Sequence, residues 1–463
     1  MIHLRYFLQK IYPVVTLQRF GVQSELRKIT ANTFWIVADN VLNIFAGLIV
    51  AAWVARYLGP ASYGQLSFAI AFVAIFIPIV TLGLKEILIR NIIRHPDQKN
   101  KMLGTAFILQ FISGLIVLFL SYLCATIISP EDRLVQVLIA IVAGSLVFRT
   151  FNLTLINWFE SQLLSKYVVW ARNIALLIIS IIKISLILLN ASVIAFAIAI
   201  LVEILLIGIG LAFFYQLCGE RIFRWRVNIQ QAKYLLKDSW PLIISGLAVA
   251  VYMKIDQIML GKMVGSEALG IYSAAVKVSE LWYFIPLALA SSFFPSIIRS
   301  REYKSKEVYN KRIQAFFDLM AGSAYLIVIP LVLIAPKLIN TLFGPEYAEA
   351  GKILQVHIWA YLFVSLEVAR RQWLMVENMT KFTMFATILG AVVNIGLNLL
   401  LIPKYEGLGS AWATLISYAI AGFFSTALTV KLWPLFRQLG LSFLIPFRLS
   451  AFWSSVREIT LKV

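Results

Sequence analysis

Among the ionisable residues inside long apolar runs of this sequence, nine stand out as candidates. In a membrane-spanning segment a charge costs on the order of 3 kcal/mol unless it faces water, a cavity or a partner. Such groups bind charged ligands, carry protons or pair with one another, so we treat all nine as candidates for chemistry. Four are basic and five are acidic: Arg149, Lys183, Lys254, Lys277, Asp39, Glu203, Asp256, Glu280 and Asp318.

The spacing of these residues limits which of them can act together. Lys277 and Glu280 are three apart and share a helix face, so they could neutralise each other. Lys254 and Asp256 are two apart and cannot face the same way on a helix. We expect one of these two to line a cavity and the other to pair between helices.

Two further stripes of polar residues appear at helical spacing. Asn32, Asp39 and Asn43 form one stripe, and Arg149 with Asn152 forms an i, i+3 pair. Polar stripes on spanning helices usually face protein or water. Asp39 could titrate as a proton-coupling group, and helix packing is the alternative.

The remaining charges are weaker candidates. Lys183 lies between isoleucines and can snorkel toward the membrane surface. Glu203 joins the coupling or charge-pair candidates. Glu367, with Arg370 and Arg371 close by, is interpreted as a self-satisfied pair near the inner rim.

The sequence predicts no metal site, disulfide framework or cofactor. The two cysteines, Cys124 and Cys218, have no metal-ligand spacing. His3, His95 and His357 lie too far apart in sequence to indicate a local ligand cluster.

The composition requires a bilayer around these residues. Of 463 residues, 61% are hydrophobic and 14% charged, against roughly a quarter charged in a soluble domain. Twelve apolar runs are each long enough to span a membrane, which predicts an all-α polytopic membrane protein of about twelve transmembrane helices. The runs are 31–55, 64–89, 102–128, 134–158, 168–189, 192–217, 240–260, 270–298, 313–334, 353–376, 382–402 and 408–430.

The net charge of +19 follows the membrane topology. Alternate connections between the runs carry 31 and 6 of the Lys and Arg residues, and four more lie inside runs. Such an asymmetry places the basic set in the cytoplasm. It predicts that both termini are cytoplasmic, and nucleic acid is not needed to explain the basicity.

The two halves of the chain show a faint internal repeat. Shifting the second half by 206 residues superimposes 58–69 on 264–275, with four of twelve positions identical, including both glycines. Two six-helix halves of the same orientation would form a parallel pseudo-repeat. The predicted organisation is a cytoplasmic amphipathic segment at 1–30, an N-lobe at 31–217, a cytoplasmic linker at 218–238, a C-lobe at 239–433 and an interfacial tail at 434–463.

Several stretches resemble the polysaccharide-transporter flippases, which include the O-antigen flippases of the multidrug/oligosaccharidyl-lipid/polysaccharide (MOP) exporter superfamily. The similar segments are Arg56–Gly64, Tyr252–Gly261, Leu269–Ala275, Asn394–Asn398 and Leu401–Thr414. The resemblance implies two MATE-like six-helix lobes around a central cavity that works by alternating access, in the cell inner or plasma membrane. It also implies a non-enzymatic carrier that moves undecaprenyl-pyrophosphate-linked oligosaccharide between leaflets.

A pyrophosphate head would need cations in that cavity, because charge crosses hydrocarbon poorly. Arg149, Asn152, Lys254 and Lys277 are therefore the predicted substrate-binding residues. The implied partners are the lipid-linked oligosaccharide, membrane lipids and a polysaccharide polymerase with its chain-length machinery. Three alternatives remain. The first is a multidrug or cation exporter of the same superfamily, for which an acidic cavity is expected. The others are a membrane polymerase, ligase or glycosyltransferase, and a scaffold without transport.

Overall fold

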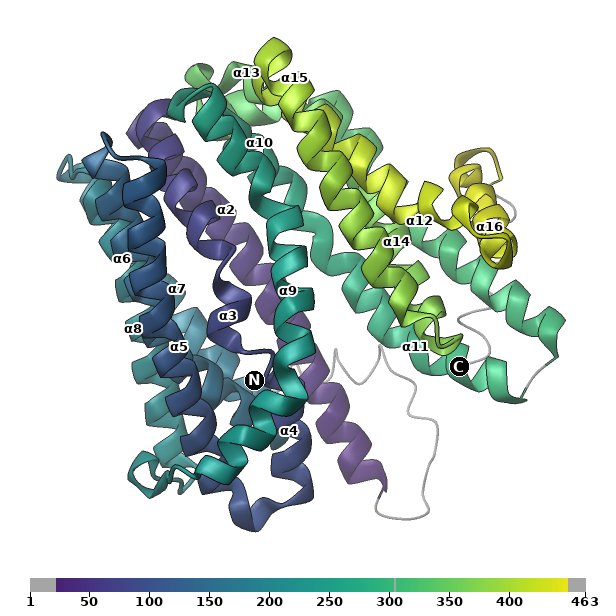
Figure 1. The fold of residues 1–463 in the computed structure, drawn as a ribbon, viewed down its shortest axis with the longest axis horizontal. Coiled ribbons are helices and arrows are strands. Elements are labelled where there is room, and N and C mark those ends of the chain that lie inside the picture. Colours follow the sequence, from purple (N-terminus) through teal and green to yellow (C-terminus); the bar gives the residue numbers. More distant parts are fainter. Residues whose placement is uncertain (1–21, 304, 449–463) are drawn as a thin grey trace, which may run out of the picture.

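Helices make up every regular element among the residues that the structure describes (Figure 1). The computed structural model describes residues 22–303 and 305–448, with side chains from position 45 onward except those at 295, 296 and 380. Within these ranges, ten helices are long and apolar enough to cross a membrane. The prediction of an all-α multi-pass membrane protein is confirmed.

The first half, called the N-lobe from here on, contains seven α-helices before the linker. Short breaks separate them, and α5 to α8 run antiparallel in succession (Figure 1). The elements are α2 (Val22–Ala74), α3 (Ile77–Thr81), α4 (Lys85–Arg94), η1 (Pro96–Gln98), α5 (Lys99–Ile128), α6 (Arg133–Ser161), α7 (Ser165–Leu188), α8 (Val193–Leu217) and the linker turn η2 (Ile222–Arg224).

The second half, called the C-lobe, repeats the long-helix pattern and adds a short C-terminal helix. The elements are α9 (Ile229–Met263), α10 (Ser266–Glu280), η3 (Leu281–Tyr283), α11 (Phe284–Tyr303), α12 (Lys306–Phe343), η4 (Pro345–Tyr347), α13 (Ala348–His357), α14 (Ala360–Val376), α15 (Thr380–Gly422), η5 (Phe424–Leu428), η6 (Val430–Leu432), α16 (Trp433–Phe443) and η7 (Ile445–Phe447).

Two of the ten long helices each contain one predicted membrane run and the first part of the next. Gly59 in α2 has φ 70° and ψ 167°, and Glu406 in α15 has φ 49° and ψ −128°, so each helix turns sharply at that residue. Dividing both helices there accounts for the twelve predicted runs. The glycine at position 59 fits because a left-handed φ costs a residue without Cβ nothing extra.

The two lobes meet where α2 packs against α10, in a close and symmetric backbone contact. A Cβ on Gly64 would lie 1.7 Å from the Ser266 carbonyl oxygen, and a Cβ on Gly270 would lie 2.0 Å from that of Pro60. Each pair is the image of the other under the shift of 206 residues. The same residue pairs therefore exchange roles across the contact, as at a two-fold axis.

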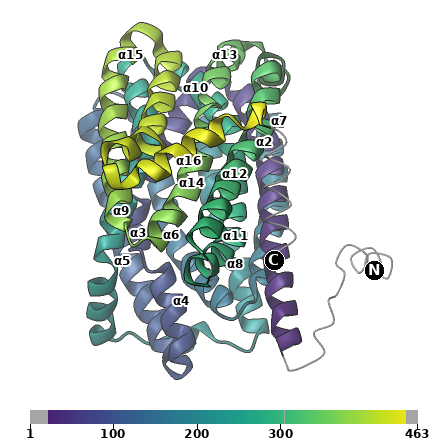
Figure 2. The same ribbon diagram turned by 90° about the vertical axis from the view of Figure 1, so that its right-hand side faces the viewer.

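The ends of the predicted organisation fall partly outside the described residues. Of the segment 1–30, residues 1–21 are not described and the rest begins α2. Of the tail, α16 crosses the outside of the C-lobe over α12 (Figure 2). There Gln314 donates to the Gln438 carbonyl at 3.1 Å, and Tyr325 donates to that of Phe443 at 3.0 Å.

Candidate functional site

An ion pair joins two neighbouring helices of the N-lobe. Lys183 Nζ of α7 lies 3.0 Å from Glu203 Oε2 of α8, with both side chains partly exposed. Lys183 thus has a protein partner within the membrane region, in place of the snorkelling expected from its apolar sequence neighbours.

A second ion pair joins the first two helices of the C-lobe. Lys254 Nζ of α9 lies 3.4 Å from Glu280 Oε2 of α10, again with partly exposed side chains. Sequence spacing suggested that Glu280 would neutralise Lys277, its neighbour on the same helix face. The packing of α9 against α10 gives Glu280 a different partner, so the suggested pairing is wrong.

Lys277 is left without an ion-pair partner by the pairing of Glu280 with Lys254 among the described residues. It forms no ion pair within the described part of the chain, and its side chain is solvent-accessible although protein surrounds it on most sides. The charges of Glu280, Lys254, Lys183 and Glu203 all act on its ammonium group. The structure therefore brings five predicted candidates from α7, α8, α9 and α10 into one group, called here the inter-lobe charge cluster. Its three lysines outnumber its two glutamates.

Asp256 lies in the interior of the C-lobe, where the charges of Lys254 and Glu280 from this cluster also act on it. Its side chain is only 5% exposed and accepts a hydrogen bond from Tyr272 Oη at 2.5 Å and from the Gln257 amide at 2.7 Å. Thr414 Oγ1 of α15 donates at 3.4 Å. Of the pair Lys254 and Asp256, the lysine is therefore the accessible member and the aspartate is the one bonded between helices.

A stripe of polar residues at helical spacing on α15, formed by Thr387, Asn394 and Asn398, extends this buried network. Asn394 Nδ2 donates to Ser417 Oγ at 3.2 Å, and Asn398 Nδ2 donates to Asn394 Oδ1 at 2.9 Å. Both asparagines are buried, and Asn398 Oδ1 has no hydrogen-bond partner within the described part of the chain. The stripe thus faces protein, and it leaves one amide oxygen able to accept a further bond.

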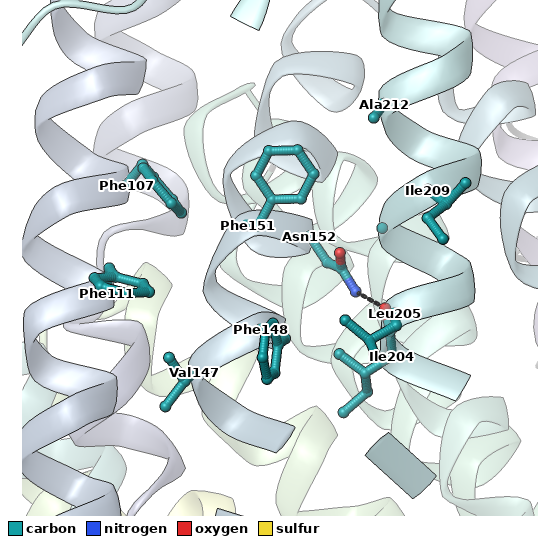
Figure 3. A pocket seen from close by; sticks show the side chains of 11 residues that line it. Phe107, Phe111, Val147, Phe148, Phe151, Asn152, Ile204, Leu205, Ile209 and Ala212 are labelled. Atoms are coloured by element: carbon teal, nitrogen blue, oxygen red, sulfur yellow. Dashed lines mark hydrogen bonds between the residues drawn. The ribbon is translucent and has the colours of Figure 1, made fainter. Parts of the chain in front are cut away.

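Arg149 and Asn152 lie elsewhere in the N-lobe, on α6. The Arg149 side chain is accessible, and the charge acting on it is that of Arg172 on α7. Asn152 is buried and donates from Nδ2 to the Ile204 carbonyl of α8 at 2.8 Å, beside an apolar pocket (Figure 3). These two residues are not among the contacts of the inter-lobe charge cluster.

The two remaining acidic candidates are Asp318, which is buried, and Asp39, whose side chain lies outside the described residues. Asp318 is buried on α12 and accepts hydrogen bonds from Gln314 Nε2 at 2.8 Å and from Ser442 Oγ at 3.0 Å, which ties α12 to α16. Asp39 lies on α2.

Arg370 is the residue whose surroundings differ most from those that the sequence suggested. Glu367 pairs with Arg371 at 2.9 Å, while Arg370 is fully buried on α14. Its Nη1 donates to the Ala421 carbonyl at 2.7 Å and to Ser425 Oγ at 2.8 Å. Nε and Nη2 have no partner within the described part of the chain. The self-satisfied pair near the inner rim is thus wrong for Arg370, whose helix turns it into the protein.

His357 is a polar core residue that spacing arguments missed. It is buried on α13, and its Nδ1 lies 2.9 Å from Ser279 Oγ of α10. Its ring meets that of Tyr272 edge-on at 5.9 Å, so it packs beside the Asp256 network. A lone histidine in an apolar run gives no sequence signal for such a role.

Comparison with known proteins identifies a family whose model matches this chain and relatives that resemble part of it. The family model described as "Polysaccharide biosynthesis protein" matches residues 29–301, more than half of the chain, and the MatE model matches residues 241–400. One relative is the Haloferax volcanii protein named "Probable low-salt glycan biosynthesis flippase Agl15", 23% identical over 42% of this chain and 41% of its own length. Another is the Staphylococcus aureus "Capsular polysaccharide biosynthesis protein CapF", 24% identical over 42% of this chain and 49% of its own. These matches span less than half the length of either relative.

Solved structures share the fold over nearly the whole chain. The "Lipid II flippase MurJ, inward closed conformation" superimposes with a TM-score of 0.68, at 13% identity, over 92% of this chain and 97% of that one. An inward-facing MATE transporter of the MOP superfamily superimposes with a TM-score of 0.58, at 14% identity, over 91% and 96%. The solved structures share the two-lobe fold, and the match to residues 29–301 confirms the predicted relationship: the chain belongs to the polysaccharide biosynthesis protein family.

Proposed function

We propose that this protein is a flippase that moves undecaprenyl-pyrophosphate-linked oligosaccharide from the inner to the outer leaflet of the cell membrane. The observation that carries the proposal is the inter-lobe charge cluster, in which Lys277 is accessible and unpaired within the described part of the chain. A diphosphate bound between the lobes would meet this cation first. Lys254 could add a second contact by exchanging Glu280 for a phosphate oxygen.

The sign of the cluster favours an anionic ligand over a cationic drug. Its solvent-accessible members are three lysines and two glutamates, whereas Asp256 is buried, so the accessible face attracts a diphosphate and repels an organic cation. A cation exporter of the same superfamily would instead be expected to present an excess of carboxylates. Two further parts of the proposal come from the sequence: cytoplasmic termini, and partnership with polymerase and chain-length machinery.

The Asp256 network is the proposed coupling element. A carboxylate held by Tyr272 and Thr414 between α9, α10 and α15 can change its bonds when those helices move. Loss or gain of a proton or another cation there would favour one arrangement of the C-lobe over another. Asp39 is kept as a second coupling candidate.

The test is complementation of a deletion strain with Lys277 variants. Lys277→Gln should lower surface polysaccharide at least tenfold while lipid-linked units accumulate on the inner leaflet, with protein abundance unchanged. Lys277→Arg should retain part of the activity because the charge survives, and Lys277→Glu should retain none. The matched control is Lys337→Gln, an exposed lysine on α12 outside the cluster.

The leaflet in which the unit accumulates separates the competing functions. Loss of a polymerase or ligase would leave the unit on the outer leaflet, and loss of a drug exporter would leave polysaccharide synthesis unchanged. Normal export by all three Lys277 variants at normal abundance would refute the cationic route.

A further inference from the structure

An apolar pocket of about 360 Å³ lies between α5, α6 and α8 of the N-lobe (Figure 3). Four phenylalanines and a set of aliphatic side chains line it, and the nitrogen of its one amide is already committed to the Ile204 carbonyl. Pockets of this size and lining bind apolar small molecules or chains. The phenylalanines are Phe107, Phe111, Phe148 and Phe151.

The pocket faces away from the proposed substrate route. On α8 its lining residues include Leu205, Gly208 and Ala212, which at 100° per residue fall on the face opposite Glu203. Two other lining side chains, Phe148 and Ile209, are 46% and 67% exposed. These residues lie within spans that cross the membrane, so the surrounding medium is lipid, and a hydrocarbon chain is the occupant that the medium supplies.

The inter-lobe linker packs against two of the aromatic rings that line the pocket. The Trp225 ring lies 5.7 Å from that of Phe107 and 6.1 Å from that of Phe151. The linker is fastened to α5, because the Asn228 amide donates to Thr105 Oγ1 at 3.0 Å and the Arg226 amide to the Asn100 carbonyl at 3.1 Å. The pocket and the linker therefore form one surface.

This end of the surface is strongly basic. Both acidic residues of the linker are neutralised by the N-lobe, Glu220 by Lys99 and Asp238 by Arg90. That leaves five linker cations without an ion pair within the described part of the chain: Arg221, Arg224, Arg226, Lys233 and Lys237.

Exposed apolar side chains alternate with these cations. Phe223 is 93% exposed and Ile229 is 73% exposed. Basic residues interleaved with exposed apolar ones next to a spanning helix are typical of segments that bind an anionic membrane surface.

We propose that the pocket and the linker together bind one anionic phospholipid. One acyl chain lies in the phenylalanine pocket, and the phosphate lies against Arg224 and Arg226, which flank Trp225, the residue whose ring packs against Phe107 and Phe151. The bound lipid holds the linker against the membrane and so sets the position from which the C-lobe moves. The charge of the linker selects an anionic headgroup over a zwitterionic one.

The experiment is native mass spectrometry of the full-length protein in detergent, with phosphatidylglycerol and phosphatidylcholine of identical chains. The wild type should retain phosphatidylglycerol at least fivefold better. Ala212→Trp fills the pocket and should lower retention of phosphatidylglycerol at least fivefold. Arg224→Gln combined with Arg226→Gln should lower it to the level of phosphatidylcholine.

Two controls and a second pocket variant keep the test decisive. Ile198→Trp, on α8 outside the pocket, and Arg94→Gln, an exposed cation on α4, should bind lipid like the wild type. Phe111→Ala should weaken retention of phosphatidylglycerol about threefold. This variant provides the test of the pocket if Ala212→Trp does not fold.

Three results would overturn the proposal. These are equal retention of both lipids by the wild type, unchanged retention in both pocket variants, and displacement of phosphatidylglycerol by tenfold less undecaprenyl phosphate. The last would assign the site to the carrier lipid. Binding is read without transport, so failure here leaves the proposed flippase activity standing.

Discussion

Glu280 can be reached by two lysines, and this makes the inter-lobe charge cluster adjustable. Lys254 holds the carboxylate at 3.4 Å, while Lys277, one helical turn before Glu280 on α10, keeps its charge available. A ligand or a mutation that removes Lys254 from the pair would release Glu280 toward Lys277. The number of free cations in the cluster therefore depends on which lysine the glutamate holds.

A double substitution tests this dependence. Lys254→Gln should lower flipping about tenfold, because Glu280 then pairs with Lys277 and neutralises it. Adding Glu280→Gln should recover a large part of the activity by freeing Lys277 again. The measurement is a double-mutant cycle on polysaccharide export at matched abundance. Additive losses in the double variant would contradict the exchange of partners.

A second prediction at this scale concerns the hydroxyl that supports Asp256. Tyr272→Phe removes the 2.5 Å bond and leaves a buried carboxylate with one acceptor site unfilled. We expect a loss of about 1–3 kcal/mol in the free energy of unfolding, measured by denaturation in detergent. Tyr405→Phe, an exposed tyrosine on α15, is the control and should change nothing. Equal stability of the two variants would show that the bond contributes nothing.

At the scale of helices, the contact between α2 and α10 depends on two glycines. Gly64→Ala would place a methyl carbon 1.7 Å from the Ser266 carbonyl oxygen, so the two helices would have to separate to relieve the clash. We expect a lower melting temperature and a loss of export. Gly144→Ala on α6 is the matched control, since its new Cβ meets nothing within 4 Å. That change should be neutral or stabilise the helix by up to about 1 kcal/mol. Similar behaviour of both variants would mean that the lobes do not need this close approach.

The sequence was sufficient for the helices and for naming the individual charges, and insufficient for which of them lie together, since Arg149 and Asn152 fall outside the cluster, and for how they pair. Apolar runs and buried charges are visible one residue at a time, so Lys254, Lys277 and Glu280 could be named in advance. The partner of Glu280 depends on how α9 rotates against α10, which spacing along one helix does not contain. The rotation of α14 likewise buries Arg370, although its neighbours Glu367 and Arg371 suggested a self-satisfied pair near the inner rim.

The apolar pocket was invisible in the sequence for a related reason. Phenylalanines on α5 and α6 look alike whether they face lipid, a neighbouring helix or a cavity. Only the packing of three helices shows that Phe107 and Phe151 line a cavity and that the linker packs against them. By contrast, the glycines of the internal repeat could be found, because a forced backbone conformation restricts the residue type at that position.

For the whole molecule, the distribution of basic residues predicts which ends face the cytoplasm. A cysteine at position 223 in the linker should react with impermeant thiol reagents only after the cytoplasmic side is opened. A cysteine at position 346, in η4, should react from outside in intact cells. Both are introduced with Cys124 and Cys218 replaced by serine. The reverse pattern, or labelling of both from the same side, would refute the proposed orientation.

The symmetric contact of Gly64 and Gly270 has a mechanical consequence for the two lobes. It lies near the start of α10, on the proposed outer side, while helices such as α12, with 38 residues, extend for about 57 Å. A tight backbone contact near one end of such long, rigid helices acts as a pivot for rotation of the lobes. If one lobe turned by about 10° around this contact, the far end of a helix about 57 Å long would move sideways by about 10 Å, which is its length multiplied by the sine of the angle. Shifts too small to break the glycine contact would thus be amplified into an opening at the cytoplasmic face.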